Sequence, residues 1–445
     1  MSHPTHPTII QGGMGVAISG WELARTVSAT GQLGVVSGTA LEVVCARRLQ
    51  LGDPGGHVRR ALAHFPAPDV AAWILAAYFV EGGIGPADSF AAVPRWTLDP
   101  GRRLQELTVA ANFVEVFLAK EGHGGVVGIN YLRKIELPLP FACFGAMLAG
   151  VDYVLMGAGN PADLPGLLRG LAHGEDVAWS VRVQGATSAD RERTVVVSPR
   201  ALLGAATPER LATPRALAIV ASVDLAAGLA DVPDCRPDGF VIEGPSAGGH
   251  NAPPRGPRRT DPQGQPVYDE RDDVDVPAVV ALGLPVWLAG SYGSPEGLRR
   301  ALAQGAVGVQ VGTAFALCQE SGMDADLKRQ VLEQVAAGVV EVRSDWRASP
   351  TGFPFRVVQL DGTLSDPAVV ADRRRVCDLG VLRSPYRTDD GTVGYRCPAE
   401  PLEVYTRRKG GRAANTEGRT CLCNALMSSA GLPQHRPHGY VEPAL

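Results

Sequence analysis

Short apolar runs alternate with stretches of helical periodicity from Thr8 to about Thr313. The runs are rich in Val and Ile and mostly apolar at successive positions, which is typical of parallel strands buried on both faces. Turn-forming residues and helical patterns separate them. The predicted strands are residues 8–11, 34–37, 126–130, 153–157, 217–222, 239–243, 285–290 and 308–312.

Helix signals fall between these strands. Ser19 and Glu22 have the spacing of a capping box, and Gly31 would end that helix. Ser294 followed by Pro295 would begin a later helix with a cap and an N1 proline. Eight strands with intervening helices predict a (β/α)₈ TIM barrel. A doubly wound open sheet is the alternative, because a strand count alone does not establish closure.

Two connections are too long for simple crossovers. Residues 41–125 follow the second predicted strand and 160–214 follow the fourth. Long insertions in compact domains often act as lids, and in a barrel these two would decorate the catalytic face. The Pro-rich, charged loop 251–275 is interpreted either as a cover over the site or as an ordinary solvent loop.

The chain beyond the barrel divides into two further parts. We expect residues 1–320 to form the barrel with its inserted lid segments. A helix at 324–337 and a Pro- and aromatic-rich segment make 321–358 a piece that packs back on the barrel. Residues 359–445 would form a small cysteine-containing module.

Composition narrows the class of protein. Of 445 residues, 45% are hydrophobic and 20% charged, as in a globular and not a disordered chain. A net charge of −4 favours neither nucleic acid nor an anionic membrane as a partner. No apolar run reaches the ~18–20 residues of a membrane span, and no secretory signal is visible. We therefore expect a cytoplasmic protein whose cysteines are thiols or metal ligands.

The candidate chemistry lies at the ends of the later strands. His250 follows Gly248 and Gly249, where the backbone can approach a flat ligand closely. Two later turns, each able to open a helix, offer bare N–H groups to a phosphate. These turns are Gly290-Ser291 and Gly312-Thr313. The pattern predicts a phosphate-anchored cofactor beside a proton-transfer group, although a histidine in such a loop, taken alone, is more often structural.

Other phosphate-binding motifs do not accompany these turns. The chain has no Walker-type Gly-Lys-Ser/Thr run, and no G-x-G-x-x-G follows an early strand. Both observations count against a nucleoside triphosphate site and against a Rossmann dinucleotide site.

Five motifs in the same order resemble those of the nitronate monooxygenase family and of its relative, the FMN-dependent enoyl-[acyl carrier protein] reductases. The resemblance covers most of residues 8–320. The motifs are Ile9-Ile10-Gln11-Gly12-Gly13-Met14-Gly15, Gly128-Ile129-Asn130, Gly157-Ala158-Gly159-Asn160-Pro161, Glu243-Gly244 with Ala247-Gly248-Gly249-His250, and the final phosphate turns.

The resemblance implies FMN bound across the carboxyl ends of the barrel strands. Gly290 and Ser291 would hold its phosphate, where the family commonly has Gly-Gly, together with Gly312 and Thr313. His250 would be the catalytic residue, orienting an anionic nitronate or exchanging a proton. The residues implied to line the flavin are Gly12, Gly13, Met14, Asn130, Gly248 and Gly249.

The function that the resemblance favours is a nitronate monooxygenase, an FMN-dependent oxidoreductase that oxidises an alkyl nitronate with O₂. The alternative is an enoyl-thioester reductase of fatty-acid or polyketide synthesis, which would use NAD(P)H and an acyl carrier protein. A catalytically silent barrel scaffold is the alternative of another class. The expected partner is a small-molecule substrate, and the oligomeric state stays open.

Four of the eight cysteines lie in the last part of the chain. Their thiolates could supply a structural zinc site, which a small loop-rich module would use for stability. An iron–sulfur cluster and plain buried thiols are the other interpretations, since no C-x₂-C pair occurs. The four are Cys377, Cys397, Cys421 and Cys423, whereas Cys45, Cys143, Cys235 and Cys318 are interpreted as core residues.

Overall fold

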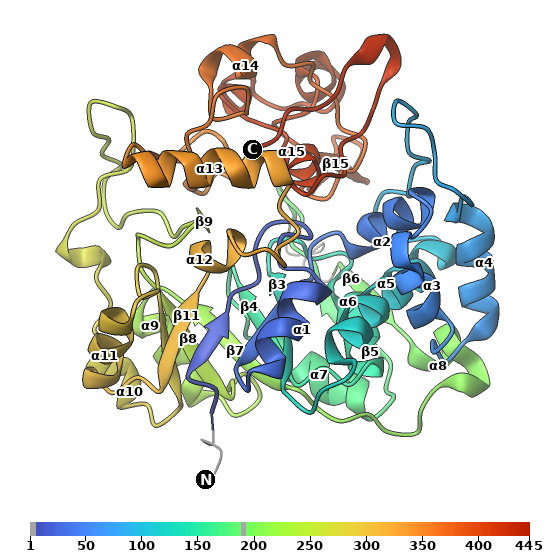
Figure 1. Ribbon diagram of the computed structural model, residues 1–445, viewed down its shortest axis with the longest axis horizontal. Helices are drawn as coiled ribbons and strands as arrows, with labels where there is room; N and C mark the ends of the chain where they lie inside the picture. The colour runs from blue at the N-terminus through green and yellow to red at the C-terminus, as the bar shows by residue number, and fades with distance from the viewer. Residues whose placement is uncertain (1–5, 188–192) are drawn as a thin grey trace.

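A computed structural model describes residues 6–187 and 193–445 of the chain. Eight parallel strands close into a barrel in the order β1-β11-β10-β8-β7-β4-β3-β2 (Figure 1). The first strand pairs with both neighbours, Gln11 opposite Val311 and Ile10 opposite Leu33, so no edge is left open. The predicted (β/α)₈ barrel is confirmed, and the open-sheet alternative is wrong. The strands are β1 (Ile9–Gln11), β2 (Leu33–Ser37), β3 (Val127–Leu132), β4 (Tyr153–Gly157), β7 (Arg215–Val220), β8 (Gly239–Glu243), β10 (Val286–Ala289) and β11 (Gly308–Val311).

Large side chains fill the barrel interior. Trp287 is fully buried there and donates its indole N–H to the carbonyl of Pro7 at 2.8 Å. The buried residues of this cluster are Ile10, Leu33, Val35, Tyr153, Leu155, Leu217, Val241, Trp287 and Ala289. As in other barrels of this kind, the interior is a packed core, and chemistry is left to the ends of the strands.

The first predicted helix begins as expected but by a different device. Gly20 is its N-cap, and no side chain caps it from within the turn. Instead, the Trp21 amide donates to a carboxylate oxygen of Glu115 at 2.9 Å, and Arg48 holds that carboxylate at 2.6 Å. The predicted Ser19–Glu22 capping box is therefore wrong, because a distant acid satisfies the helix start. At α11 the prediction is confirmed: Ser294 accepts from the amide of Gly297 at 3.0 Å.

Both long insertions are present. The first holds three helices beside the barrel and then α5, which packs on the strands and on α6 (Figure 1). The second carries an antiparallel pair, β5 (Val177–Ser180) and β6 (Thr194–Val197). The helices up to β7 are α1 (Trp21–Ala29), α2 (Leu41–Gln50), α3 (His57–Leu62), α4 (Pro68–Tyr78), α5 (Arg102–Lys120), α6 (Leu139–Leu148), α7 (Leu164–Ala172) and α8 (Pro199–Leu203).

The C-terminal extension, orange to red in Figure 1, lies over the end of the barrel at which the strands finish. Its strand β13 pairs antiparallel with both β12 and the two-residue β9. The remaining elements are α9 (Val223–Asp231), β9 (Gly249–His250), α10 (Val276–Val280), α11 (Pro295–Ala303), α12 (Thr313–Ala316), α13 (Ala325–Ala337), β12 (Val342–Asp345), β13 (Phe355–Val358), α14 (Pro367–Asp372), β14 (Ser384–Arg387), β15 (Val393–Arg396) and α15 (Leu422–Ser429).

The last part of the chain shares the main core. Met427 and Leu432 belong to the same apolar cluster as residues of α2 and α5, and Arg47 donates to the Leu432 carbonyl at 2.5 Å. The predicted division at residues 320 and 358 stays a prediction.

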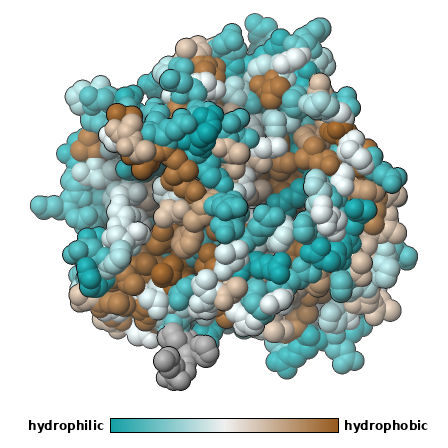
Figure 2. Space-filling model, viewed as in Figure 1, coloured by the Kyte–Doolittle hydropathy of each residue, from teal (hydrophilic) through white to brown (hydrophobic). Residues whose placement is uncertain are grey.

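The surface carries some exposed apolar side chains. Figure 2 shows apolar patches among hydrophilic surface, and exposed apolar residues on and after α13 include Val335 and Val339. Among the described residues, no helix is both long and apolar enough to cross a membrane.

The contact between α5 and α6 depends on a glycine. A Cβ on Gly145 of α6 would lie 2.1 Å from the Val109 carbonyl oxygen of α5. We expect Gly145→Ala to destabilise the fold by about 1–3 kcal/mol through overpacking. The matched control is Gly228→Ala in α9, where a Cβ meets nothing within 4 Å; it should stabilise by up to about 1 kcal/mol. Denaturant midpoints measure both, and a stabilising Gly145→Ala would contradict this packing.

Candidate active site

The turn after β1 is held by side-chain hydrogen bonds. The hydroxyl of Ser19 accepts from the Met14 amide at 2.9 Å and donates to the Gly12 carbonyl at 2.9 Å. Gln11, fully buried, donates to the Gly12 carbonyl at 2.6 Å. The predicted flavin-lining segment is therefore fixed in shape without any ligand.

Predicted site residues from three strands meet at this turn. A Cβ on Gly13 would lie 2.5 Å from the Cβ of Asn130, which only glycine avoids. On the other side, a Cβ on Gly312 would lie 3.5 Å from the Met14 sulfur. The structure thus brings the ends of β1, β3 and β11 together as the sequence suggested.

The two predicted phosphate turns follow β10 and β11. Gly290 has φ 90° and Ser291 φ 60°, both in the left-handed region. Ser291 adopts this conformation at a cost that glycine would avoid. A Cβ on Gly290 would lie 3.0 Å from the Ser246 hydroxyl, so the loops after β8 and β10 are in contact.

Open space lies beside Gly248 and Gly249. A Cβ at either position would meet nothing within 4 Å, and Gly249 has φ 75°. Near Gly12, the side-chain oxygen of Gln310 is buried without a hydrogen-bond partner in the described residues. Free space and an unsatisfied polar atom at the strand ends fit a flat, polar cofactor such as FMN. Gln310 was missed by the sequence analysis, although a glutamine inside an apolar strand was a usable signal.

His250 is clamped by the C-terminal extension. Its Nε2 lies 2.6 Å from the hydroxyl of Ser349, which lies 2.7 Å from that of Thr351. Its ring also packs edge-on against Phe355 at 4.6 Å. Burial first, and then the charge of Lys134, lower the pKa of His250 well below its ordinary value. The imidazole is therefore neutral at neutral pH and can accept a proton or a hydrogen bond.

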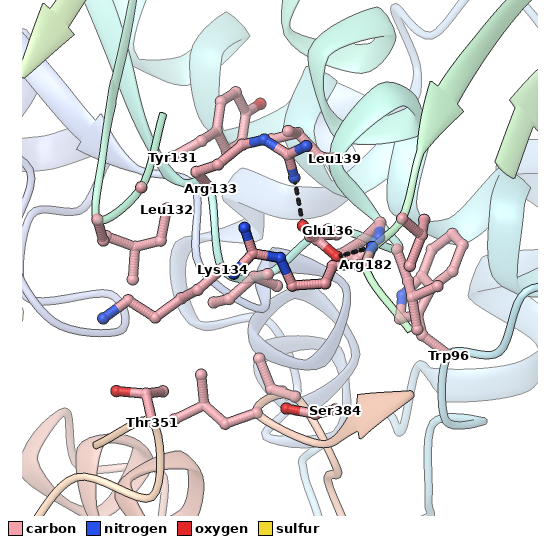
Figure 3. A pocket seen from close by; sticks show the side chains of 18 of the residues that line it. Trp96, Tyr131, Leu132, Arg133, Lys134, Glu136, Leu139, Arg182, Thr351 and Ser384 are labelled. Atoms are coloured by element: carbon pink, nitrogen blue, oxygen red, sulfur yellow. Dashed lines mark hydrogen bonds and ion pairs between the residues drawn. The ribbon is translucent and has the colours of Figure 1, made fainter. Parts of the chain in front are cut away.

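A cavity of about 640 Å³ adjoins this histidine through Thr351 (Figure 3). Residues that follow β3, Arg133 and Lys134 among them, form one side, and Thr351 and Ser384 of the extension face them. Both long insertions also contribute to the wall, with Glu42 and Arg182. In the described part of the chain, the lining of this cavity includes none of the predicted flavin residues. The cavity is therefore a second space next to the predicted cofactor site.

Charged groups in and beside this cavity are strongly perturbed. Arg133 pairs with Glu136 at 2.6 Å and stacks on Trp179 at 4.6 Å. Lys134 has a buried ammonium without a partner in the described residues, and burial lowers its pKa to about 7. Burial raises the pKa of Glu243, at the end of β8, to about 7. Perturbed ionisable groups that gather at one cleft are typical of a functional site.

Lys134 and Ser349 were both missed by the sequence analysis. Lys134 lies two residues after the strand that contains Asn130, and its place near a barrel strand end was the available signal. Ser349 lies about a hundred residues from His250 in sequence, and only the pairing of β9 with β13 brings them together.

The zinc hypothesis finds no support. Within the described residues, no group of three or more His, Cys, Asp or Glu side chains is placed to hold a metal ion. Cys397 and Cys421 are instead buried together, with Cys423 packed against them and all thiols free. Burial raises the pKa of Cys377 to about 11. Cys45 and Cys143 are buried as predicted, whereas Cys235 and Cys318 are half-buried.

Residues 186–351, which contain His250 and Ser349, match the model of the nitronate monooxygenase family. The predicted family resemblance is confirmed. The match ends at Thr351, so most of the C-terminal extension lies outside this nitronate monooxygenase region.

Two curated relatives match shorter segments. Both are named (3aS,4S,5R,7aS)-5-hydroxy-7a-methyl-1-oxo-octahydro-1H-indene-4-carboxyl-CoA dehydrogenase. The Mycobacterium tuberculosis protein is 34% identical over 125 residues, 28% of this chain and 30% of that protein. The Rhodococcus jostii protein is 30% identical over 144 residues, 32% of this chain and 35% of that protein. The match spans about a third of the length of each relative.

Several solved structures are similar at low identity. FabK from Thermotoga maritima has a TM-score of 0.43 and 17% identity, covering 82% of this chain and 73% of its own. The nitroalkane oxidase from Streptomyces ansochromogenes has a TM-score of 0.40 and 16% identity, covering 79% and 76%. The enoyl reductase domain of MlnA from Bacillus amyloliquefaciens has a TM-score of 0.42 and 12% identity, covering 80% and 64%.

Glu42 provides a pH test of burial at the cavity. Burial raises its pKa from 4.5 to about 7, so the folded protein binds more protons than the unfolded chain between these values. The free energy of unfolding therefore falls as pH rises from 4.5 to about 7. Above this range the full cost of burying the charged carboxylate is present. We expect Glu42→Gln to stabilise by on the order of 1–3 kcal/mol at pH about 8 and hardly at pH about 4.

Thermal unfolding at the two pH values measures the effect of Glu42→Gln. Glu22→Gln is the matched control, because Glu22 also lies in the first turn of a helix but is exposed. An equal shift of Glu42→Gln at both pH values would contradict the raised pKa.

Proposed function

We propose that this chain is an FMN-dependent oxidoreductase that oxidises an alkyl nitronate with O₂ to a carbonyl compound and nitrite. The observation that carries the proposal is a half-buried His250 with a lowered pKa, held by Ser349 beside the open space at Gly248 and Gly249. The match to the nitronate monooxygenase family covers this same loop.

The residues at the strand ends would divide the work. FMN, when bound, supplies the electron chemistry, and the protein supplies position and electrostatics. Gly12, Gly13, Met14 and Asn130 would lie against its ring, with Gly248 and Gly249 allowing close approach. The turns Gly290-Ser291 and Gly312-Thr313 would hold its phosphate through backbone N–H groups.

His250 would manage the proton. Because its pKa is low, it is ready to accept a proton or to orient a substrate through a hydrogen bond without carrying charge itself. Ser349 fixes the ring, since the hydroxyl and Nε2 are 2.6 Å apart. The extension that carries Ser349 also lies over the strand ends (Figure 1).

A second candidate is an FMN-dependent reaction on an acyl thioester. The size of the cavity favours it, since about 640 Å³ is more than a nitronate of a few atoms fills. The two curated relatives are named as dehydrogenases of an acyl-CoA. For an enoyl-thioester reductase, the partners would be NAD(P)H and an acyl carrier protein or coenzyme A ester.

Anaerobic titration of the FMN-loaded protein separates the candidates. We expect a nitronate alone to bleach the flavin absorbance rapidly, because it would be the electron donor. Bleaching by NADPH alone would instead favour the thioester reductase. A protein that takes up no FMN would contradict both candidates.

Replacement of the histidine tests its role. We expect His250→Ala to lower turnover by roughly two to four orders of magnitude, the usual contribution of a general acid–base group. His173→Ala is the matched control, because His173 is exposed and its ring contacts only the Arg169 carbonyl of its own helix. Unchanged turnover in His250→Ala would remove this residue from the mechanism. Unchanged function in vivo together with lost turnover would favour the scaffold.

A further inference from the structure

The chain contains only four lysines among 42 basic residues. Lys120 and Lys409 form ion pairs at 2.7 and 2.6 Å, and Lys328 donates to three backbone carbonyls. The ammonium of Lys134 differs, because it is buried and has no hydrogen-bond or ion-pair partner in the described residues. Because a buried cation without a counter-charge is costly, an anion bound beside this amine would stabilise its charged form.

The neighbours of Lys134 compensate its charge only in part. Its ammonium lies 4.3 Å from the centre of the Phe353 ring, a modest cation–π contact. Glu243 at the end of β8 favours the charged lysine without forming an ion pair with it, and the pKa of His250 on β9 lies well below its ordinary value. The adjacent Arg133 is engaged by Glu136 and Trp179. Lys134 is thus a donor without a hydrogen-bond partner in the described residues, at the wall of the cavity.

Its position excludes the cofactor phosphate as the missing partner. Lys134 follows β3, whereas the predicted phosphate turns follow β10 and β11. In the closed strand order, β3 and β10 are four strands apart in either direction, on opposite sides of the barrel. Lys134 instead lines the cavity, on the side where Thr351 of the extension faces it (Figure 3).

The same wall connects this lysine to the catalytic candidate. Thr351 lines the cavity, and its hydroxyl joins that of Ser349, which reaches His250 Nε2. A ligand held by the ammonium would therefore lie within the space that leads to the histidine.

We propose that the ammonium of Lys134 binds a compact oxyanion of the substrate, a nitronate or a carboxylate group, in the cavity beside His250. The identity of this oxyanion as part of the reacting molecule rests on the proposed function. The binding of an oxyanion in the cavity by Lys134 is independent of that function. The bound anion supplies a counter-charge to the ammonium. The carbon skeleton of the substrate then extends along the cavity.

Calorimetric titration with butyrate and with butyramide tests the binding. These probes have the same skeleton and differ in charge. Wild-type protein should bind butyrate more tightly than butyramide. Lys134→Met should lose about 10- to 100-fold of the butyrate affinity, the range for a hydrogen bond to a charged group, with butyramide affinity unchanged.

Three further variants make the result specific. Lys120→Met removes an ammonium from before β3, at the opposite end of the barrel, and should bind butyrate as wild type does. Lys134→Arg should retain the preference for the anion, and Lys134→Gln should lose it, which keeps the test decisive if the methionine variant does not fold. Wild-type affinity for butyrate in Lys134→Gln, or equal wild-type affinity for butyrate and butyramide, would overturn the proposal.

Anaerobic bleaching by propyl-1-nitronate distinguishes the source of the oxyanion. We expect Lys134→Gln to raise the nitronate concentration needed for half-maximal bleaching by the same 10- to 100-fold. If wild type binds butyrate through Lys134 but no nitronate bleaches its flavin, the proposed function fails and the oxyanion site stands, with a carboxylate as its ligand. If nitronate bleaches both proteins with equal concentration dependence, Lys134 does not bind the nitronate: its assignment to the substrate is overturned, and the proposed function stands.

Discussion

The candidate site depends on the attachment of the C-terminal extension to the end of the barrel. The two-residue strand β9 pairs with β13, and this places Phe355 opposite His250 and brings Ser349 to 2.6 Å from its Nε2. Without that pairing, the histidine would be a residue on a glycine-rich loop. With it, the imidazole has a fixed orientation, an aromatic neighbour and a hydroxyl partner.

The same attachment sets the electrostatics. Thr351 and Phe353 of the extension close the cavity over Lys134, so the ammonium loses water without gaining an anion. Loss of water lowers the pKa values of Lys134 and His250 and raises that of Glu243. The extension contributes to this burial through the contact of Phe353 with Lys134 and of Phe355 with His250. A site that binds an anion and moves a proton requires this combination of dryness and uncommitted charge.

Sequence patterns predicted the structure correctly where an element depends on neighbouring residues or on a periodic pattern. The strands of the barrel followed from continuous apolar runs, because a parallel strand buried on both faces leaves no polar positions. Ser294 caps α11 as predicted, since its partner amide is three residues away. The capping box at Ser19 failed for the converse reason: Glu115, far along the chain, satisfies that helix start, and Ser19 fixes the turn of Gly12 and Met14 instead.

By itself, then, the sequence determined the barrel and the order of its strand-end motifs, and it indicated His250 as the residue to examine. Each of these depends on a short segment whose local pattern is sufficient to predict it. The tertiary structure alone decided which side chains surround them. The hydroxyl of Ser349 meets His250 across about a hundred residues of chain, Lys134 is buried by a distant segment, and the four late cysteines gather without forming a metal site among the described residues. Burial and charge compensation depend on segments that are distant in the sequence, so no local sequence pattern predicts them.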